Sequence, residues 1–387
     1  MSKKEETSKT VKEMKSEDKK TATKSSEEKT EVKKSTSKDK KDPEDWIEEI
    51  LPKQKKSPVE TPSARKSQTK DLSDVAVNQI PGIGPAVAEK LISAGYLTLA
   101  AVAHASPIEL AEHCEIGEQT AQRLISASRS QIGIGFKNAK ELLQTRNKLV
   151  KIPTGSKSLD TLLGGGIETS SLTEISGEFR TGKTQICFQL CVTTAMSKNL
   201  GGLESGIIYI DTEGTFRPER IVQICNRFNA PAEEVLSRIN VGRAYNSDHQ
   251  MVLILESPKF IKEGNVKLLI IDSLTSHFRA EFAGRNSLLE RQQKLNKFLH
   301  QLLRLAEVYD VAVVATNQVL SKPDVLYGET IFPIGGNIVA HSCTTRIFLR
   351  KGKGEKRIAR VIDSPHIPEI ETVFMIGSEG ILDMNES

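Results

Sequence analysis

From residue 151 onward, short apolar runs alternate with segments in which apolar residues recur at helical spacing. The clearest runs are 206–211, 267–273 and 311–316. Runs of this length predict buried strands, and the segments between them predict helices. Strands that alternate with helices indicate an α/β fold with a mostly parallel sheet, in which ligands bind at the C-terminal ends of the strands.

Residues 71–131 show a helical pattern of another kind. A glycine turn containing Gly82 and Gly84 opens one apolar-periodic segment, and a weaker copy at 115–120 opens a second. The pair resembles helix-hairpin-helix units, which offer backbone N–H groups at a helix N-terminus to a DNA phosphate without reading the base sequence. The alternative is a small all-α domain that only packs or binds protein, because a fold alone does not establish DNA contact.

The segment 132–150 connects these two regions. Its first part alternates glycines with apolar residues and carries Phe136 and Ala139. Such a segment is typical of a hinge or of a strand with little stability of its own. Phe136 could anchor an added strand at the sheet edge of a neighbouring molecule, or it could pack on its own core. Spacing alone does not choose between the two.

Residues 1–70 are rich in Lys, Glu, Ser and Thr and are predicted to be disordered. They carry 20 Lys and Arg against 15 Asp and Glu, which leaves 34 basic and 35 acidic residues in 71–387. Nucleic-acid binding by the remainder would therefore depend on local basic loops. One patch, 42–51, contains the only Trp, Trp46. It is either a partner-docking motif or a transient helix without a partner.

The composition excludes several classes of protein. No apolar run approaches the ~20 residues of a membrane span, and the N-terminus has no apolar segment of a secretory signal. None of the five cysteines forms a C-x-x-C pair, so we expect reduced thiols in a cytoplasmic protein and no zinc site.

The stretch 177–184 fits the phosphate-loop pattern of Gly, four free positions, Gly, Lys and Ser or Thr. A strand candidate at 171–176 precedes it and a helical pattern follows, which disfavours a chance glycine loop. Lys183 is expected to reach the β- and γ-phosphates of a nucleotide, and the Thr184 hydroxyl to ligate Mg²⁺. The candidate nucleotide-binding residues are Gly177, Glu178, Phe179, Arg180, Thr181, Gly182, Lys183, Thr184 and Gln185.

Three polar residues come at the ends of predicted strands. Asp272 has the Walker B position and is expected to hold Mg²⁺ beside Thr184. Glu213 is the candidate for orienting the attacking water, with helix capping as the alternative role. Gln318 is the candidate sensor of the γ-phosphate. All three should lie close together, because the ends of parallel strands meet at one edge of a sheet.

Two stretches after strands are predicted to be binding loops. The first, 277–291, mixes aromatic residues with Arg279, Arg285 and Arg291. The second, 320–337, contains Gly335 and Gly336. Loops longer than ~12 residues in a compact domain are usually functional or disordered. Arginines and backbone amides beside a nucleotide site suit the phosphate backbone of a nucleic acid.

Several stretches in combination resemble one family. They are 177–185, 211–220, 316–319, 333–338 and 349–355, together with His341. These stretches closely resemble the RecA/RadA recombinases, and above all their archaeal RadA branch. The resemblance covers roughly residues 72–384. It implies a RecA-like ATPase core at 151–387 behind the helix-hairpin-helix domain.

The resemblance implies a DNA-dependent ATPase that forms a filament or ring on single-stranded DNA and exchanges strands with double-stranded DNA. ATP and Mg²⁺ are the implied cofactors, K⁺ is a further candidate ion, and recombination mediators are candidate partners. Arg220 resembles the residue that stacks on adenine, and Phe179 and His341 resemble residues that couple ATP across subunits. Phe136 and Ala139 match the family's F-x-x-A polymerisation motif, which favours strand addition.

The chain departs from the family at the subunit interface implied for Glu329 and Pro333. Glu329-Thr330 replaces Asp-Pro in the cap over the neighbour's ATP, and Phe332 replaces a basic residue before Pro333. The first departure bears on the cation dependence of ATP turnover, and the second bears on part of the DNA contact. A non-catalytic paralogue and a RecA-fold helicase are the competing hypotheses. The intact motifs argue against the first, and the absence of translocation motifs argues against the second.

Overall fold

The structure is a computed structural model that describes residues 74–80, 83–284, 286–321 and 331–384. Contacts divide the chain into two units, Met1–Ser67 and Gln68–Ser387, and only the second contains described residues. The predicted tail with its Trp46 patch lies outside them. So do three of the predicted site residues, which are Gly82, Arg285 and Glu329.

The N-terminal described region is all-helical, as its pattern predicts. The first glycine turn ends at Gly84, which caps α2 and is followed by a proline at the first helical position. The second turn ends at Gly117, which caps α5. Val77, Leu91, Leu99 and Leu110 belong to the apolar core that the helices enclose. The elements are η2 (Val77–Gln79), α2 (Pro85–Ser93), α3 (Leu99–Ala103), α4 (Pro107–Cys114) and α5 (Glu118–Ile132).

The connector differs from its predicted strand-like character. Residues 134–138 form neither a strand nor a helix, and α6 (Ala139–Arg146) follows them. The side chain of Asn138 caps this helix and forms a capping box with Glu141. A local side-chain cap thus starts a helix where the alternation of glycine and apolar residues ends. No residue of α6 is buried.

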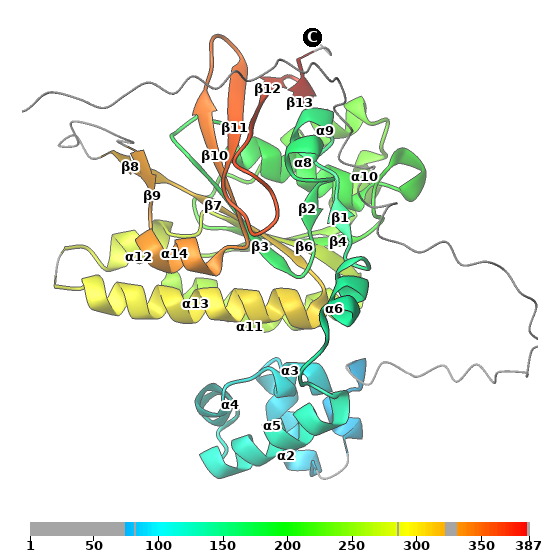
Figure 1. Ribbon diagram of the computed structural model, residues 1–387, viewed down its shortest axis with the longest axis vertical. Coiled ribbons are helices and arrows are strands. Elements are labelled where there is room, and N and C mark those ends of the chain that lie inside the picture. Colours follow the sequence, from blue (N-terminus) through cyan, green and yellow to red (C-terminus); the bar gives the residue numbers. More distant parts are fainter. Residues whose placement is uncertain (1–73, 81–82, 285, 322–330, 385–387) are drawn as a thin grey trace, which may run out of the picture. The chain divides into compact units, whose positions relative to one another are not determined.

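The core is built on a nine-stranded sheet in the order β13-β12-β11-β10-β3-β7-β6-β4-β5. The strands from β10 to β5 are parallel, and β10 to β13 are antiparallel. The mostly parallel sheet is therefore confirmed (Figure 1). Its strands are β3 (Ser171–Gly177), β4 (Gly206–Asp211), β5 (Ile239–Arg243), β6 (Val266–Asp272), β7 (Ala312–Asn317), β10 (Thr345–Lys351), β11 (Lys356–Asp363), β12 (Glu371–Gly377) and β13 (Gly380–Asp383).

Two small sheets accompany the large one. They are β1 (Lys151–Ile152) with β2 (Ile167–Glu168), and β8 (Val319–Ser321) with β9 (Ile331–Pro333). The second pair corrects the prediction of a loop over the whole of 320–337. Val319 faces Pro333 in an antiparallel ladder, so 319–321 and 331–333 are strands that hold each other, and α14 begins at Gly336 within the same segment.

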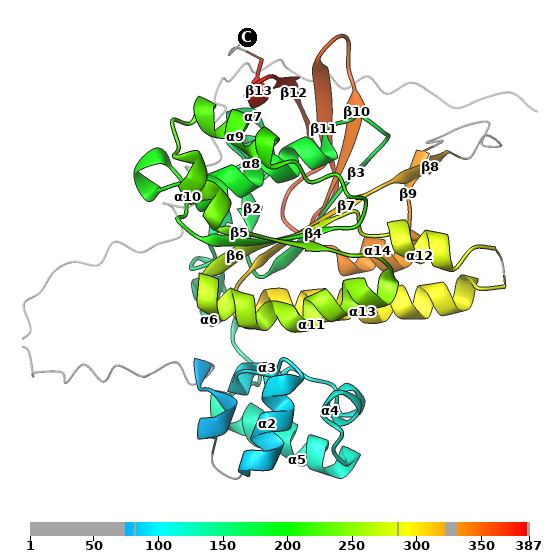
Figure 2. The same ribbon diagram turned by 180° about the vertical axis from the view of Figure 1, so that it is seen from behind.

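Helices cover both faces of the large sheet (Figures 1 and 2). Alternate residues of β4 face opposite sides, as a strand requires: Tyr209 joins the cluster with α8 and α9, and Ile208 joins the cluster with α11 and α13. The helices are α7 (Lys157–Leu162), α8 (Lys183–Ala195), η3 (Lys198–Leu200), α9 (Pro218–Arg227), α10 (Ala232–Ser237), α11 (Ser247–Gly264), α12 (Ser276–Glu281), α13 (Leu288–Tyr309) and α14 (Gly336–Ser342). None of these helices is both long and apolar enough to cross a bilayer, within the described residues.

The register of the sheet brings the ends of its parallel strands together. The last residues of β4, β5 and β6 are direct partners: Asp211 faces both Arg243 and Asp272. Near the ends of β3 and β7, Ser176 faces Asn317. Polar residues from five strands are thereby collected at one edge, as the sequence pattern predicts for a ligand site.

The last strand ties the C-terminus to the start of the core. The Asp383 carboxylate accepts hydrogen bonds from the backbone N–H of Lys157 at 2.8 Å and of Ser158 at 3.1 Å, and from the hydroxyls of Ser156 and Ser158. Burial raises the pKa of Asp383, but these donors lower it by more, so its pKa lies below the ordinary value. Asp383 therefore acts as a cap for α7 from more than two hundred residues away in the chain.

Replacing Asp383 with Ala should lower the free energy of unfolding by about 1 kcal/mol, because amides at the start of α7 lose their acceptor. Urea unfolding at pH 7 measures the loss, with Glu371→Ala on β12 as a control for an exposed carboxylate. Because the folded-state pKa is lowered, the stabilisation is present above about pH 4 and is lost as the pH falls through the lowered value. An equal difference at pH 3 and pH 7 would contradict the capping role.

Candidate functional site

The stretch 177–184 forms a turn between β3 and α8. Gly182 has φ +106°, and a Cβ there would lie 2.6 Å from the Cδ1 of Ile376, so only glycine fits. A Cβ on Gly177 would lie 2.5 Å from the Leu349 carbonyl oxygen. The turn delivers its backbone to the N-terminus of α8, where unpaired amides and the helix dipole favour an anion.

A cavity of about 670 Å³ opens beside this turn. Its walls come from the turn itself and from the ends of β4, β6 and β7. The Lys183 ammonium lies at the cavity and donates to the carbonyls of Gly177 at 2.8 Å and Glu178 at 2.9 Å. Burial lowers the pKa of Lys183 against the opposing effect of Asp272 and Glu213. The size, the amides and the cation together suit a nucleoside triphosphate.

Asp272 is the buried anion of the site, with 5% of its surface exposed. Its Oδ2 accepts hydrogen bonds from the Thr184 hydroxyl and the Tyr209 hydroxyl, both at 2.8 Å, and its Oδ1 accepts one from Thr316. Burial raises the pKa of Asp272, and the three donors lower it by less, so the pKa lies above its ordinary value. The adjacent Thr184 hydroxyl and Asp272 carboxylate are oxygen donors of the kind Mg²⁺ prefers, so these residues fit that ion.

Glu213 lies across the cavity and is exposed to solvent. Its Oε1 accepts a hydrogen bond from the Ser273 hydroxyl at 2.9 Å and another from the side-chain amide of Gln318 at 2.9 Å. Two donors thus fix one oxygen, and no described residue donates to Oε2. The three strand-end residues Asp272, Glu213 and Gln318 line the same cavity, as the sequence analysis predicts.

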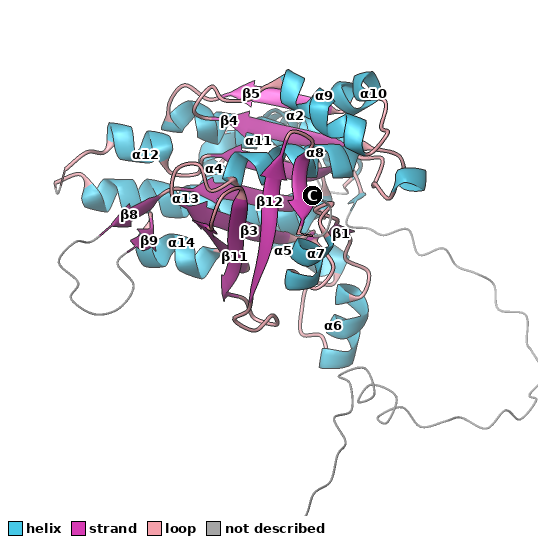
Figure 3. Ribbon diagram, turned by 90° about the horizontal axis from the view of Figure 1, so that it is seen from above, coloured by secondary structure: helices cyan, strands magenta, loops and turns pink. Residues whose placement is uncertain are grey.

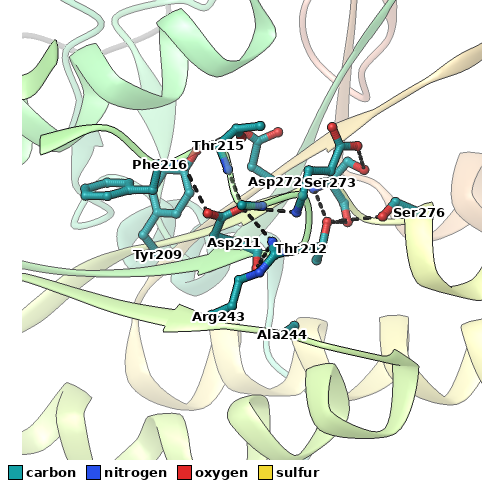
Figure 4. A network of polar contacts seen from close by, with 12 residues as sticks. Tyr209, Asp211, Thr212, Thr215, Phe216, Arg243, Ala244, Asp272, Ser273 and Ser276 are labelled. Carbon is teal, nitrogen blue, oxygen red and sulfur yellow. Dashed lines mark hydrogen bonds and ion pairs between the residues drawn. The ribbon is translucent and has the colours of Figure 1, made fainter.

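The loop that carries Glu213 is held by Asp211 (Figure 4). The Asp211 carboxylate accepts the N–H groups of four successive residues, at distances from 2.7 to 3.2 Å. These residues are Glu213, Gly214, Thr215 and Phe216. Four charge-assisted hydrogen bonds to one carboxylate therefore restrain a loop that belongs to no helix or strand.

A second polar network lies behind the site. The Asn317 side-chain amide donates to the fully buried Glu174 and to the Ile334 carbonyl, both at 2.6 Å, and its oxygen accepts from Thr275 at 2.8 Å. Arg346 donates to the other oxygen of Glu174 at 2.6 Å. Thr275 precedes α12 and Ile334 follows β9, so one amide holds the bases of both predicted binding loops.

The predicted first loop is partly helical. Arg279 lies on α12 and Arg291 on α13, and only 282–287 separates the two helices. The apolar repeat that begins at Leu288 marks the start of α13, and the interpretation of 277–291 as one loop missed it. Arg279 donates to the Gln318 side-chain oxygen at 3.2 Å. The base of this segment therefore contacts the predicted γ-phosphate sensor.

At the second loop, Gly335 has φ +100°, and a Cβ there would lie 2.2 Å from a methyl carbon of Val339. Gly335 caps α14, Gly336 begins it, and His341 is an exposed residue of its last turn. Pro333 pairs with Val319 in the hairpin. Gly335, Gly336, His341 and Pro333 do not line the cavity. Their predicted contacts with DNA or with a neighbouring subunit stay predictions.

Four further predicted residues have distinct surroundings. The Arg220 Nε donates to Gln185 at 2.8 Å and its Nη2 to the Gly377 carbonyl at 2.8 Å, which places its guanidinium beside the start of α8. Phe179 is 80% exposed and Phe136 is fully exposed, at 111% of the reference value. Phe136 therefore does not pack on its own core, which removes one of the two alternatives for it. Ala139 is exposed as well.

The sequence analysis missed some residues of the site. Tyr209 and Thr316 donate to Asp272, Ser273 donates to Glu213, and Arg357 of β11 lines the cavity. The Arg357 Nε is buried without a hydrogen-bond partner among the described residues. The hydroxyls stand at or near the ends of predicted strands, which is a usable signal. Arg357 reaches the site only through the position of β11, and no local motif marks it.

Comparison with known proteins identifies relatives of both regions. The profile of the Rad51 family matches residues 145–384. The profile of the SAM-like helix-hairpin-helix tandem matches residues 74–130. A curated protein of Aeropyrum pernix, named DNA repair and recombination protein RadA, is 48% identical over 318 residues. The match covers 82% of this chain and 98% of the relative.

Replacing Tyr209 with Phe should raise the Mg²⁺ concentration needed for half-maximal nucleotide binding by about threefold. The change removes one of the donors that orient Asp272 and keeps the aromatic packing against Phe188 and Phe216. Titration of a fluorescent ATP analogue with Mg²⁺ measures the shift. Thr193→Val, which removes a buried hydroxyl on α8, serves as the control. Equal midpoints for Tyr209→Phe and the parent protein would exclude Tyr209 from the metal site.

Proposed function

The chain belongs to the Rad51 family, and from this premise we propose that it is a DNA-dependent ATPase that assembles on single-stranded DNA and exchanges homologous strands in recombination and repair. The observation that carries the proposal is the geometry of Glu213. One of its carboxylate oxygens is fixed by Ser273 and Gln318, and the same cavity contains the phosphate turn and the buried Asp272.

Different residues of the cavity have different roles in ATP hydrolysis. The amides at the start of α8 and the Lys183 ammonium bind the phosphates, and Thr184 and Asp272 hold Mg²⁺, which neutralises phosphate charge when bound. Oε2 of Glu213 orients the attacking water and accepts its proton. Arg220 contributes to adenine binding, and its position beside Gln185 supports this role.

The contact between Gln318 and Arg279 supports coupling between nucleotide and DNA. Gln318 touches Glu213 on one side and α12 on the other, so a change at the γ-phosphate reaches the base of the first DNA-binding segment. Asn317, the preceding residue, holds the second segment through Ile334. Arg279, Arg291 and the glycines at 335 and 336 contribute to the path of the phosphate backbone. The amides behind Gly84 at the start of α2 provide a second phosphate contact.

Assembly follows from two complementary features of one chain. Phe136 and the irregular segment 134–138 are exposed, with their backbone outside any ladder. Among the described strands β5 pairs with β4 alone, so its outer edge is open (Figure 3). Val241 on this edge is 46% exposed, and Tyr245 beyond its end is 72% exposed. The segment of one subunit adds to β5 of the next and buries Phe136 against these side chains.

Other parts of the function are proposed on narrower support. Glu329 and His341 contribute to the neighbour's nucleotide site, and K⁺ is the candidate ion beside Glu329. Recombination mediators are candidate partners, and the 42–51 patch is a candidate site for them. The cytoplasm is the proposed location, which the five free, buried cysteines support. Residues 71–131, 132–150 and 151–387 serve as the DNA-contacting domain, the polymerisation linker and the ATPase core.

The central test is formation of joint molecules between single-stranded DNA and a homologous duplex, with ATP. The parent should form them and Lys183→Ala should not, because the phosphates lose their cation. Glu213→Gln should bind ATP and DNA but hydrolyse ATP at least about a hundredfold more slowly, since amide replaces the acid–base group. Glu219→Gln, an exposed residue of the same motif, is the matched control. Parent-like turnover in Glu213→Gln would remove Glu213 from the reaction.

Replacing Phe136 with Glu should convert large assemblies into small species, because a carboxylate would have to enter the neighbour's apolar surface at a cost of several kcal/mol. Sedimentation velocity measures the size distribution, and the thermal midpoint shows that the core remains folded. Ile108→Glu, which alters an exposed apolar side chain on α4, is the matched control. Assemblies of unchanged size would exclude Phe136 from the polymer contact.

A further inference from the structure

The open edge of the sheet is connected directly to the catalytic loop. Arg243 is the last residue of the edge strand β5. Its Nη1 donates to the backbone oxygen of Asp211 at 3.1 Å and to Oδ1 of the same residue at 3.3 Å. The N–H of Ala244 donates to the same backbone oxygen at 3.0 Å. Figure 4 shows the Arg243 guanidinium beside Asp211.

Asp211 passes this contact on to the loop. Its side chain is only 6% exposed, and its charge is balanced by the four backbone amides of 213–216 and by the Arg243 guanidinium. A buried carboxylate loses stability when any of its donors moves away. The orientation of Asp211 and that of the loop bearing Glu213 therefore depend on where Arg243 lies.

Gly214 provides a second contact between the same two parts. It has φ +73°, and a Cβ there would lie 3.3 Å from the carbon and one nitrogen of the Arg243 guanidinium. The guanidinium thus packs directly against the backbone of the loop. Any displacement of the end of β5 displaces a group that touches the loop at both Asp211 and Gly214.

We propose that Arg243 is a positioning residue for ATP hydrolysis, which couples occupation of the β5 edge by a neighbouring subunit to the orientation of Glu213. The inference rests on the proposed function. A short strand that is paired on one side only opens locally more easily than an interior strand. When a neighbour adds its segment, β5 becomes an interior strand, its end is held, and Arg243 fixes Asp211 and the loop. A free subunit then hydrolyses ATP more slowly than an assembled one.

The test measures hydrogen exchange of peptides covering 212–217, without DNA or nucleotide, in the parent and in Phe136→Glu. Assembly should slow exchange of the four amides bound to Asp211 by about tenfold in the parent. In Arg243→Gln, assembly should change the exchange rate of these amides by less than about twofold. Equal exchange in assembled and unassembled parent protein would overturn the coupling. An unreduced effect of assembly in Arg243→Gln would overturn the role of Arg243.

Steady-state kinetics supply a second readout. Arg243→Gln should lower kcat for ATP about tenfold with KM within about twofold, because nucleotide contacts are intact and only Glu213 is misplaced. Arg243→Lys, which keeps the charge, should recover part of the loss. Arg238→Gln is the matched control, since Arg238 lies at the other end of β5 and pairs with the exposed Glu204 and Glu234. A rise in KM without a fall in kcat would contradict the positioning role.

The outcomes of these experiments distinguish a failure of the coupling through Arg243 from a failure of the proposed polymer contact. If Phe136→Glu leaves the assembly size unchanged, the polymer contact itself is wrong. If the size falls while the loop amides exchange alike in both proteins, the polymer contact stands and the coupling through Arg243 does not. If Arg243→Gln unfolds at lower temperature than Arg238→Gln and fails to assemble, Arg243→Lys takes its place in the exchange measurement. Assembly should then slow exchange by less than it does in the parent, and an effect as large as in the parent would overturn the role of Arg243.

Discussion

The buried carboxylate of Asp272 is the constraint on which the site depends. It is an anion at the end of an interior strand, almost without access to water, and such a group is stable only when donors surround it. Those donors come from α8, β4 and β7, so three elements must stand in register before the charge is satisfied. The parallel sheet supplies that register, and the phosphate turn can deliver Thr184 because β3 lies next to β7.

The same principle recurs in the two networks around it. Asp211 and Glu174 are both buried acids, and each accepts at least one hydrogen bond from a segment that is distant in sequence. Arg243 from the edge strand donates to Asp211, while Asn317 and Arg346 donate to Glu174. Each buried acid therefore joins the cavity wall to a more distant segment. The contacts that satisfy these charges are also the ones through which the proposed coupling would run.

The sequence predicted what is local and missed what is tertiary. The phosphate turn, the strand at 206–211 and the positions of Asp272 and Glu213 at strand ends depend on short motifs with a fixed spacing. The helical start of 277–291 and the β8–β9 ladder depend on the packing of distant segments, so periodicity over a few residues misplaced their boundaries. The register between neighbouring strands decides where Tyr209, Ser273 and Arg243 lie. That register cannot be read from any single stretch of sequence.

The exposed Phe136 and the open edge of β5 have a consequence for growth. They are different surfaces of one chain, so the proposed contact between them would be heterologous, and every added subunit would recreate both features. An assembly built by this contact has polarity. One terminus presents an unoccupied strand edge, and the other presents an unburied phenylalanine. A protein that recognises only one of these features would control elongation at one terminus and leave the other free to grow, whereas closure into a ring removes both termini at once.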